Sequence, residues 1–371
     1  ASTLVAWIVG RTPPAEAVFR IVGAHTDSPN LRLKPQAESS VEGYRQWGVE
    51  VYGGVLLHTW FDRDLGLSGR AWVRSPGGGI EQRLLRIDRP IARVADLSIH
   101  LNRKIRSDGF KPNEQKELPP IVGLGDKDAP SVLDRLLLES LSCEPDEILG
   151  WDLMLHDTQA SVLGGMDREF VFAPRMDNQA SCYTALRGLL SAEVGAPTAL
   201  VALFDHEEVG SRSAQGADGV VLESCLRRIC EAFPAKGGLA RAAANSFMVS
   251  ADMAHGVHPN YADRHDGDHK PRINGGPVIK ANANQRYATD GETAARFRRA
   301  CMDVEVPVQD FINRTDLACG STIGPISSAN LGIRAVDVGC AMLSMHSIRE
   351  HAGAADIELM ARVKARVLSG L

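Results

Sequence analysis

Several short apolar runs in this sequence end in side chains that can bind a metal or move a proton. Imidazoles and carboxylates are common ligands of divalent metals, and a carboxylate can also act as a general base. These runs, each with the polar residues that follow it, are Val18–Ala24 with His25 and Asp27, Ala199–Phe204 with Asp205 to Glu208, Ser246–Ala251 with Asp252, and Arg334–Val338 with His346 further on.

His25 and Asp27 are two residues apart after the first run. On an extended segment residues i and i+2 point to the same side, so the two side chains can reach one another. A carboxylate beside a metal-binding imidazole fixes its tautomer and raises its basicity. A single His-x-Asp pair is more often an ordinary hydrogen-bonded histidine of the surface or the core.

The run Asp205-His206-Glu207-Glu208 places four acidic or imidazole groups directly after a buried strand. Such groups repel one another and resist burial unless a cation neutralises them. Two adjacent glutamates allow one to bind a metal while the other moves a proton. The same segment, taken alone, also fits an exposed acidic loop.

Three further residues could each have a purely structural role, but together with the residues above they indicate a metal site. Asp177 could cap a helix, Asp252 could lie in a solvated loop, and His346 could be a core histidine. With His25 and Glu208 they supply two imidazoles and three carboxylates from five separate segments. That set suits two divalent cations that share a bridging carboxylate. Zn²⁺ is the first choice, with Mn²⁺ or Co²⁺ as substitutes.

The order of elements predicts an α/β fold with a mostly parallel central sheet flanked by helices. The strand-like runs alternate with helical stretches, and in such sheets ligands bind where strands end at their carboxyl edge. The predicted helices are Gln179–Ala192, Leu222–Phe233, Glu292–Met302 and Ala354–Leu368.

Residues 67–163 differ in character, with glycine-rich turns, strand-like pieces and few clustered carboxylates or histidines. We therefore expect a β-rich second domain inserted at 67–163 into a catalytic domain formed by 1–66 and 164–371. A length of 371 residues also favours two domains.

Composition limits the classes of function without naming one. Hydrophobic residues make up 44% and charged residues 23%, with a formal net charge of −5 and no basic block that would suggest nucleic acid. The apolar runs are too short to span a membrane. Seven scattered cysteines without a Cys-x-x-Cys pair favour a reducing compartment, so we expect a cytoplasmic protein that binds neither nucleic acid nor membrane.

At this point the sequence resembles a known family, the aspartyl aminopeptidases of the M18 family of metallopeptidases. The resemblance extends over nearly the whole chain, and family members usually carry further N-terminal residues, so we expect residues to be missing before Ala1. The matching segments are Gly23–Pro29, Tyr52–Val55, Trp60–Leu65, Arg175–Ser181, Asp205–Ser211, Ser250–Asp263, Gly276–Tyr287, Cys319–Pro325 and Met345–Glu350.

The resemblance implies a zinc-peptidase-like catalytic domain and a role for each matched residue. His25, Asp177 and Asp252 are expected to bind metal, with Asp177 bridging two ions, while Glu208 and His346 complete the ligand set of the second ion. Glu207 is the expected general base and Asp27 the carboxylate that orients His25. The peptide bond between Asp177 and Asn178 is expected to be cis.

The resemblance also implies a substrate and an assembly. The family prefers peptides with an unblocked N-terminal Asp or Glu, so we expect Lys280 to pair with the substrate side chain and His255 to contribute to substrate binding. Lys280 could instead be an edge-strand lysine that reaches solvent. Relatives form homo-oligomers, tetrahedral shells of twelve subunits assembled through the inserted domain. His100 is expected to reach a neighbouring active site, although its pattern also fits a buried histidine.

Two other functions are compatible with the same residues. A metal-dependent deacylase of N-acyl amino acids would share the metal pair but would need no site for a free α-amine. A non-catalytic metal-binding scaffold would have no use for Glu207 beside Glu208, which weighs against it.

Overall fold

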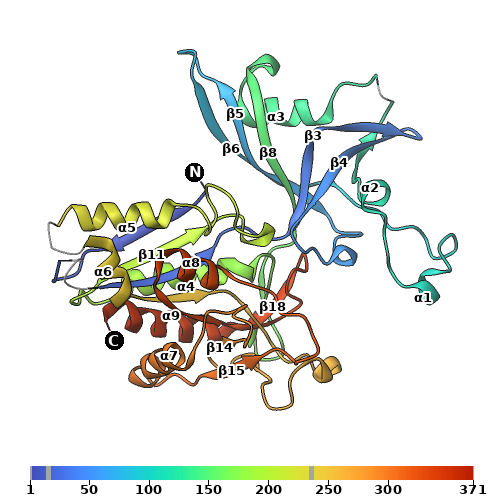
Figure 1. Cartoon of the computed structure of the whole chain (residues 1–371). Coiled ribbons are helices and arrows are strands. Elements are labelled where there is room, and N and C mark those ends of the chain that lie inside the picture. The colour runs from blue at the N-terminus through green and yellow to red at the C-terminus, as the bar shows by residue number, and fades with distance from the viewer. Residues whose placement is uncertain (1, 14–17, 127, 234–237, 371) are drawn as a thin grey trace. The chain divides into compact units, whose positions relative to one another are not determined.

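A computed structural model describes residues 2–13, 18–126, 128–233 and 238–370 of the chain, shown in Figure 1. The chain divides into two compact units. The first comprises Ala1–Ser28, Ser161–Met345 and Glu350–Leu371, and the second comprises Pro29–Ala160 and His346–Arg349.

A seven-stranded sheet forms the centre of the first unit, in the order β1-β11-β2-β12-β16-β14-β15. The four strands β11, β2, β12 and β16 run parallel, while β1 and β14 pair antiparallel with their neighbours β11 and β16. The strands are β1 (Leu4–Ile8), β2 (Phe19–His25), β11 (Thr198–Phe204), β12 (Phe247–Ala251), β14 (Val278–Ala281), β15 (Gln309–Ile312) and β16 (Arg334–Gly339).

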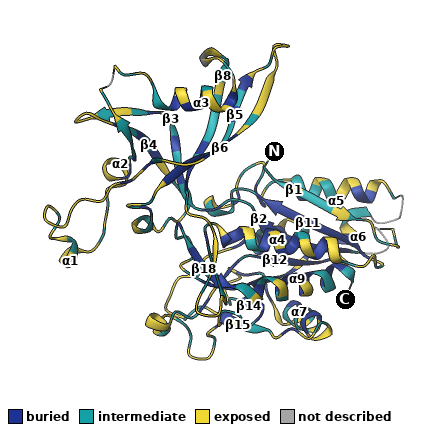
Figure 2. Ribbon diagram, turned by 180° about the vertical axis from the view of Figure 1, so that it is seen from behind, coloured by how far each residue is buried: buried dark blue, intermediate teal, exposed yellow. Residues whose placement is uncertain are grey.

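Helices cover both faces of this sheet, which confirms the predicted α/β class. Strands β11 and β12 are buried at every residue and β2 at every residue except Arg20, as expected for parallel strands covered on both sides, and these strands are dark in Figure 2. The helices are α4 (Met176–Ser191), α5 (Val221–Glu231), α6 (Gly238–Asn245), α7 (Gly291–Asp303), α8 (Ile323–Leu331) and α9 (Ala354–Ser369).

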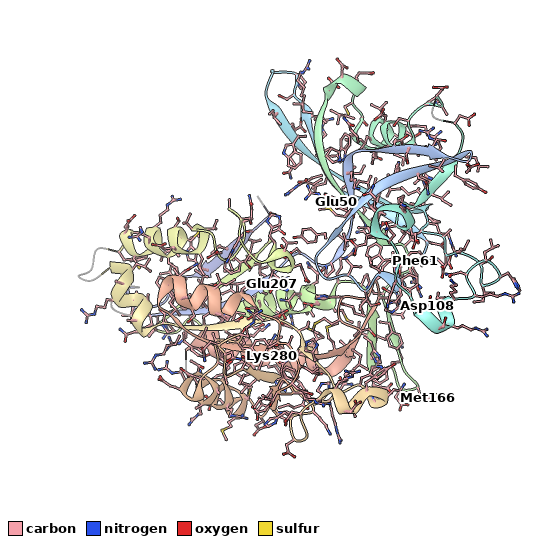
Figure 3. The ribbon with its side chains drawn as sticks, turned by 45° about the vertical axis from the view of Figure 1, so that its right-hand side comes forward. Glu50, Phe61, Asp108, Met166, Glu207 and Lys280 are labelled. Atoms are coloured by element: carbon pink, nitrogen blue, oxygen red, sulfur yellow. The ribbon has the colours of Figure 1, made fainter. Side chains whose placement is uncertain are left out.

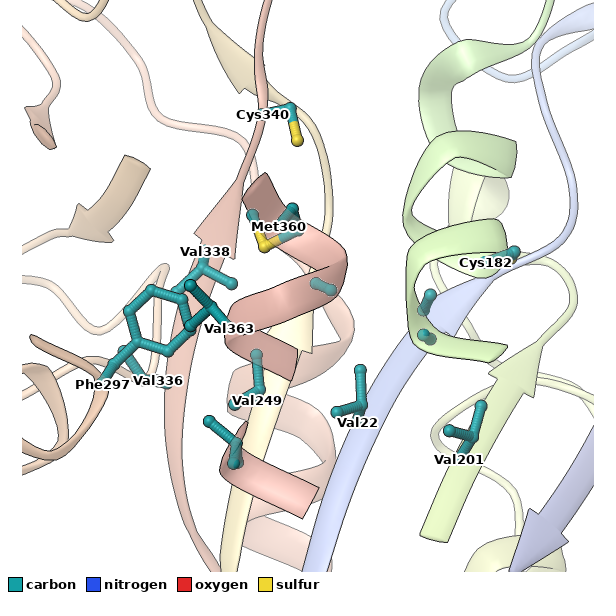
Figure 4. Close-up of a cluster of buried hydrophobic side chains, with 14 of the residues drawn as sticks. Val22, Cys182, Val201, Val249, Phe297, Val336, Val338, Cys340, Met360 and Val363 are labelled. Carbon is teal, nitrogen blue, oxygen red and sulfur yellow. The ribbon is translucent and has the colours of Figure 1, made fainter. Parts of the chain in front are cut away.

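Alternate residues of each strand enter different cores because successive side chains point to opposite faces. Val22 and Val201 pack with α4, α7 and α9 on one face, a cluster drawn in Figure 4. Ile21 and Leu200 pack with α5, α6 and α8 on the other. The four helices predicted from the sequence are α4, α5, α7 and α9, each within a few residues of its expected bounds.

A second, smaller sheet in the first unit has the order β13-β17-β18-β10-β9. It brings together segments that are far apart in the sequence, and it places Glu350 opposite Ala173 in the pairing of β18 with β10. Its strands are β9 (Val162–Gly164), β10 (Phe170–Ala173), β13 (Ala254–His255), β17 (Ala341–Leu343) and β18 (Glu350–Gly353).

The second unit is β-rich, as predicted, with a six-stranded antiparallel sheet in the order β6-β5-β8-β3-β4-β7. The strands are β3 (Asn30–Val41), β4 (Tyr44–Tyr52), β5 (Leu65–Arg74), β6 (Ile80–Ala92), β7 (Ile121–Leu124) and β8 (Ile148–Asp157). Its helices are α1 (Ile105–Asp108), α2 (Glu114–Glu117) and α3 (Val132–Leu141), and the short 3-10 turns of the chain are Leu57–Thr59, Pro145–Glu147, Glu207–Val209 and Pro259–Arg264.

The second unit begins at Pro29 rather than at the expected residue 67, and it ends at Ala160 rather than 163. The reason is strand pairing over long sequence separations: β3 pairs with β8, and β4 pairs with β7. Leu31, Leu33 and Trp47 of these early strands are buried in the same core as Leu153 and Leu155 of β8.

A lysine of α9 is buried against α4, where its ammonium donates to a hydroxyl and a carbonyl group. Lys364 is fully inaccessible, and its Nζ donates to the Thr184 hydroxyl at 2.7 Å and to the Ser181 carbonyl at 3.3 Å. Burial lowers the pKa of Lys364 from 10.5 to about 8, although the Cys340 and Cys182 thiols oppose this change. Below pH 8 the folded state therefore carries an unfavourable buried charge.

This lysine predicts a specific dependence of stability on pH. Between pH 8 and 10.5 the unfolded state binds more protons than the folded state, so the free energy of unfolding rises with pH. We expect Lys364 to contribute a rise of about 2 kcal/mol between pH 7.5 and 9.5. Urea unfolding at both pH values measures it. This rise in the free energy of unfolding should be missing in Lys364→Met. It should remain in Lys270→Met, the matched control at an exposed lysine. An unchanged rise in Lys364→Met would contradict this assignment.

Candidate metal centre

His25, the last residue of β2, is the centre of a cluster of carboxylates. The residue is 1% exposed. Its Nε2 lies 3.3 Å from Asp252 Oδ1 and 3.5 Å from Asp177 Oδ1. Glu207 Oε2 lies 3.9 Å from the same nitrogen. The structure therefore brings four of the predicted site residues together around one imidazole nitrogen.

The electrostatics of His25 reflect this crowding. Burial alone would lower its pKa, but interactions with the Asp177, Asp252 and Asp27 carboxylates raise it well above its usual range. An imidazole surrounded by anions attracts positive charge, and that charge is supplied by a proton or by a metal ion. Metal ligation by the imidazole requires its neutral form, so the two compete.

Asp27 links His25 to the segment that carries the paired glutamates. The Nδ1 atom of His25 lies 3.1 Å from the Asp27 carbonyl oxygen and 3.4 Å from its Oδ1. The same carboxylate accepts the backbone N–H groups of Glu207 and Glu208, each at 3.1 Å. Asp27 is thus in contact with the imidazole, as expected, and it also fixes the Glu207–Val209 turn, which the sequence did not predict.

Asp177 lies in the first turn of α4, and the Asp177–Asn178 peptide bond is cis. Both residues are buried and have non-helical backbone angles, so Asp177 is not a simple helix cap. Its carbonyl accepts the Ser28 hydroxyl at 2.6 Å, and its N–H donates to Glu350 Oε2 at 3.0 Å. The Asn178 amide donates to the Ala251 carbonyl at 2.8 Å, next to Asp252.

Further bonds tie α4 to the end of β2. The Cys182 thiol lies 2.9 Å from the His25 carbonyl, and the Gln179 side chain donates to the Thr26 carbonyl at 2.7 Å. These contacts set the distance between the segments that carry His25 and Asp177. Asn178, Cys182 and Glu350 all lie within or beside motifs visible in the sequence, but nothing in their types alone indicated this role.

Glu207 differs from the other carboxylates in its ionisation. Burial raises the pKa of Glu207 to about 7; the charge of His25 opposes the change, while Asp252, Asp177 and Asp27 add to it. By contrast, the pKa of Asp252 falls well below its usual range despite its burial, because the positive charge of Lys280 and the His25 imidazole stabilise its ionised form. Two carboxylates of one site thus differ in proton affinity, as in many acid–base pairs.

The donor atoms fit a divalent metal. One atom each from His25, Asp177 and Asp252 lies within 4.8 Å of the others, and the same holds for His25, Glu207 and Glu208. Imidazole nitrogen with carboxylate oxygen is a donor set that zinc and neighbouring transition metals accept. Together these groups can hold a cation, orient water beside it and exchange a proton.

Lys280 contacts the Asp252 side chain from another strand of the central sheet. It lies within β14, which runs antiparallel to β16 and has β15 on its other side, so it is not an edge-strand lysine. The residue is 2% exposed, and its Nζ lies 3.2 Å from Asp252 Oδ2 and 3.1 Å from the Met253 carbonyl. Figure 3 labels both Lys280 and Glu207.

Two aromatic rings and a second imidazole surround this part of the site. The Lys280 ammonium lies 5.1 Å from the centroid of the Tyr287 ring. His255, in β13, reaches solvent and packs edge-on against Phe311 with the ring centroids 5.7 Å apart. Desolvation and the charge of Lys280 lower the pKa of His255. Both effects favour the neutral form of the His255 imidazole.

His346 and His100 belong to the second unit. The ring Nδ1 of His346 lies 2.8 Å from the Gly54 carbonyl. His100 is exposed and lies in a turn, so it is not the buried strand or helix histidine that its pattern also allowed.

An α/β sheet that gathers an imidazole and several carboxylates at the carboxyl end of its parallel strands has the architecture of a metallohydrolase. Residues 1–365 match the model of a family described as aminopeptidase I zinc metalloprotease (M18). The chain belongs to the M18 family and is a metalloaminopeptidase.

Named relatives and solved structures agree with this. The chain is 48% identical over 366 residues to a probable M18 family aminopeptidase 2 from Ectopseudomonas mendocina, and 49% identical to one from Pseudomonas aeruginosa strain LESB58. Each match covers 98% of this chain and 84% of the relative.

The fold matches solved structures over almost its whole length. A chain in the cryo-EM structure of the Ape4 and Nbr1 complex has a TM-score of 0.95 at 40% identity, covering 99% of this chain and 74% of that one. The S. cerevisiae mApe1 dodecamer gives 0.82 at 29% identity, covering 98% and 82%. Among the described residues, no helix has the length and apolarity needed to cross a membrane.

The double contact of Asp27 predicts a loss of metal affinity when its carboxylate becomes an amide. In Asp27→Asn a single oxygen remains to accept the N–H groups of Glu207 and Glu208, so their segment shifts. Metal affinity should fall about 10- to 100-fold. Competition with a chromophoric chelator measures this, and the exposed Asp263→Asn is the matched control. Wild-type affinity in Asp27→Asn would show that the carboxylate does not support the site.

Proposed function

We propose that this aminopeptidase releases unblocked N-terminal Asp or Glu from peptides. The observation that carries the proposal is the buried Lys280 ammonium, 3.2 Å from the side chain of Asp252. A buried cation needs an anionic partner, and an ammonium has three N–H donors. Asp252 and the Met253 carbonyl accept from two of them. The third would donate to the carboxylate of an acidic substrate side chain.

The metal ligands follow from the same cluster. His25, Asp177 and Asp252 would hold one divalent ion, with Asp177 shared, and Glu208 and His346 would complete the shell of a second. The contact of His346 Nδ1 with the Gly54 carbonyl supports its assignment, because an N–H donated there makes Nε2 the ligand atom. Zn²⁺ is the proposed metal, with Mn²⁺ or Co²⁺ as substitutes.

A metal pair supplies polarisation of the scissile carbonyl and acidification of the attacking water. The protein's own groups do the rest. Glu207 takes a proton from the attacking water while the water oxygen adds to the carbonyl carbon. Glu207 then delivers that proton to the leaving amine as the C–N bond breaks. Its raised pKa, about 7, supports exchange in both directions near neutral pH. Lys280 and His255 hold the side chain of the residue to be released.

We also propose that the protein is a homo-oligomer, a tetrahedral dodecamer assembled through the second unit. The exposed apolar side chains of Leu97, Ile99 and Leu101 flank His100, and such a group of side chains favours contact with another chain. In that assembly His100 would stabilise the reaction's oxyanion in a neighbouring subunit.

The proposed location of the protein in the cell is the cytoplasm.

Replacement of Glu207 separates proton transfer from metal binding. Glu207→Gln should lower turnover about 10²- to 10⁴-fold, the usual contribution of a general base, while metal content stays at the wild-type level. The neighbouring Glu208→Gln should instead lose metal. Turnover of a Glu anilide and elemental analysis of the same samples measure both. Metal loss in Glu207→Gln would show that this residue is a ligand and not the base.

The substrate proposal is tested by a panel of anilides with different N-terminal residues. The wild-type enzyme should prefer Asp and Glu over Leu, Lys and N-acetylated Glu, which also separates an aminopeptidase from an N-acyl deacylase. Lys280→Met should lower kcat/KM for Glu about 10- to 100-fold more than for Leu, because it removes a charge-assisted bond. Lys270→Met should have no effect. A wild-type preference for Leu or Lys over Asp and Glu would refute the specificity.

A further inference from the structure

A second buried carboxylate lies beside Lys280 and belongs to none of the metal-binding groups. Asp337, in β16, is completely inaccessible. Strand pairing places Lys280 of β14 opposite it on one side and Ser250 of β12 opposite it on the other. Burial raises the pKa of Asp337, and the positive charge of Lys280 opposes that rise.

Three groups donate to the Asp337 carboxylate, and each comes from a different segment. The hydroxyls of Ser250 and Thr322 both donate to Oδ1, each at 2.6 Å. The backbone N–H of Ala288 donates to Oδ2 at 2.6 Å. These bonds join β12, the start of α8 and the segment before α7 at one buried group.

The segment before α7 is held from both directions. Besides the bond from Ala288 to the carboxylate, the backbone N–H of Asp337 donates to the Thr289 hydroxyl at 2.9 Å. Tyr287 directly precedes these two residues and is itself buried, with its ring facing the Lys280 ammonium. The position of the Tyr287 ring therefore depends on the anchorage of Ala288 and Thr289 to Asp337.

The fit around the carboxylate is tight. A Cβ atom at Gly324 would lie 2.4 Å from Asp337 Oδ2 and 2.7 Å from its Oδ1. The first turn of α8 thus approaches the carboxylate at a point where only glycine leaves room. A carboxylate packed and hydrogen-bonded in this way has little freedom to move, so it can hold neighbouring residues in fixed positions.

We propose that Asp337 is a positioning residue for recognition of the substrate's acidic side chain. It fixes the Tyr287 segment against Lys280 and places a second carboxyl group beside the ammonium. When a metal shares the charge of Asp252, Asp337 remains as the buried counter-charge of Lys280. The inference rests on the proposed function, in which Lys280 binds the substrate carboxylate.

The test compares Glu and Gln anilides, which differ in side-chain charge but little in shape. In Asp337→Asn, the ratio of kcat/KM for Glu over Gln should fall about tenfold, which corresponds to about 1.4 kcal/mol. The change should appear as a higher KM for Glu, while kcat for Gln and the metal content stay near wild type. Because Asp337→Asn alters both the carboxyl group and its hydrogen bonds, a variant that keeps the carboxyl group is also needed.

A second variant keeps the carboxylate. Thr289→Val removes only the hydroxyl that accepts the Asp337 N–H, and we expect a smaller rise, about threefold, in KM for Glu. Thr198→Val is the matched control, because it removes a buried strand hydroxyl that accepts the Gly10 N–H instead. If Asp337→Asn does not fold, Thr289→Val decides the question.

Each outcome separates this inference from the proposed function. A wild-type enzyme with no preference for Glu over Gln refutes the proposed specificity and, with it, the role of Asp337. A wild-type preference that survives unchanged in folded Asp337→Asn and Thr289→Val overturns the positioning role alone. An equal fall of kcat for both substrates would also overturn it, since that result indicates a general structural defect.

Discussion

Carboxylates from Asp252, Asp177 and Glu207 lie 3.3, 3.5 and 3.9 Å from a single imidazole nitrogen of His25, in a region where the imidazole is almost completely buried. Like charges at such short separation repel strongly, and little water is present to screen them. The arrangement is stable only with compensating positive charge. Lys280, 3.2 Å from Asp252, supplies part of that charge, and the proposed metal ions would supply the rest.

The backbone around the site resists that repulsion through hydrogen bonds that cross between elements. Asp27 accepts the N–H groups of both glutamates, and Glu350 accepts the N–H of Asp177. With this preorganisation the proposed ligands would need little rearrangement to bind a cation. Beyond Lys280, Asp337 supplies a similar support through bonds from three segments.

The sequence predicted the parts of the site that depend on local pattern. Apolar runs that end in His25, Glu207 and Asp252 are parallel strands, and parallel strands bring their carboxyl ends to one edge. The order of the strands and the direction of β14 depend on contacts between distant segments. The position of Lys280 inside the sheet, from which its side chain reaches Asp252, therefore has no local sequence signature.

The same limit explains the other differences. The sequences of β3 and β4 do not indicate which sheet these strands join. The start of the second unit at Pro29 therefore could not be predicted. In the sequence, Asp337 is only one residue of the mostly apolar run Arg334–Val338. Its partners are 15 to 87 residues away in the sequence, and no local pattern indicates them.

The central claim, that the carboxylate cluster exists to hold a metal pair, is tested most directly by counting metal ions against activity. Protein stripped by a chelator would be titrated with Zn²⁺ while bound metal per chain and hydrolysis of a Glu anilide are followed together. We expect no activity in the stripped protein and complete recovery at two bound ions per chain. Full activity in the stripped protein, or recovery unrelated to metal content, would contradict it.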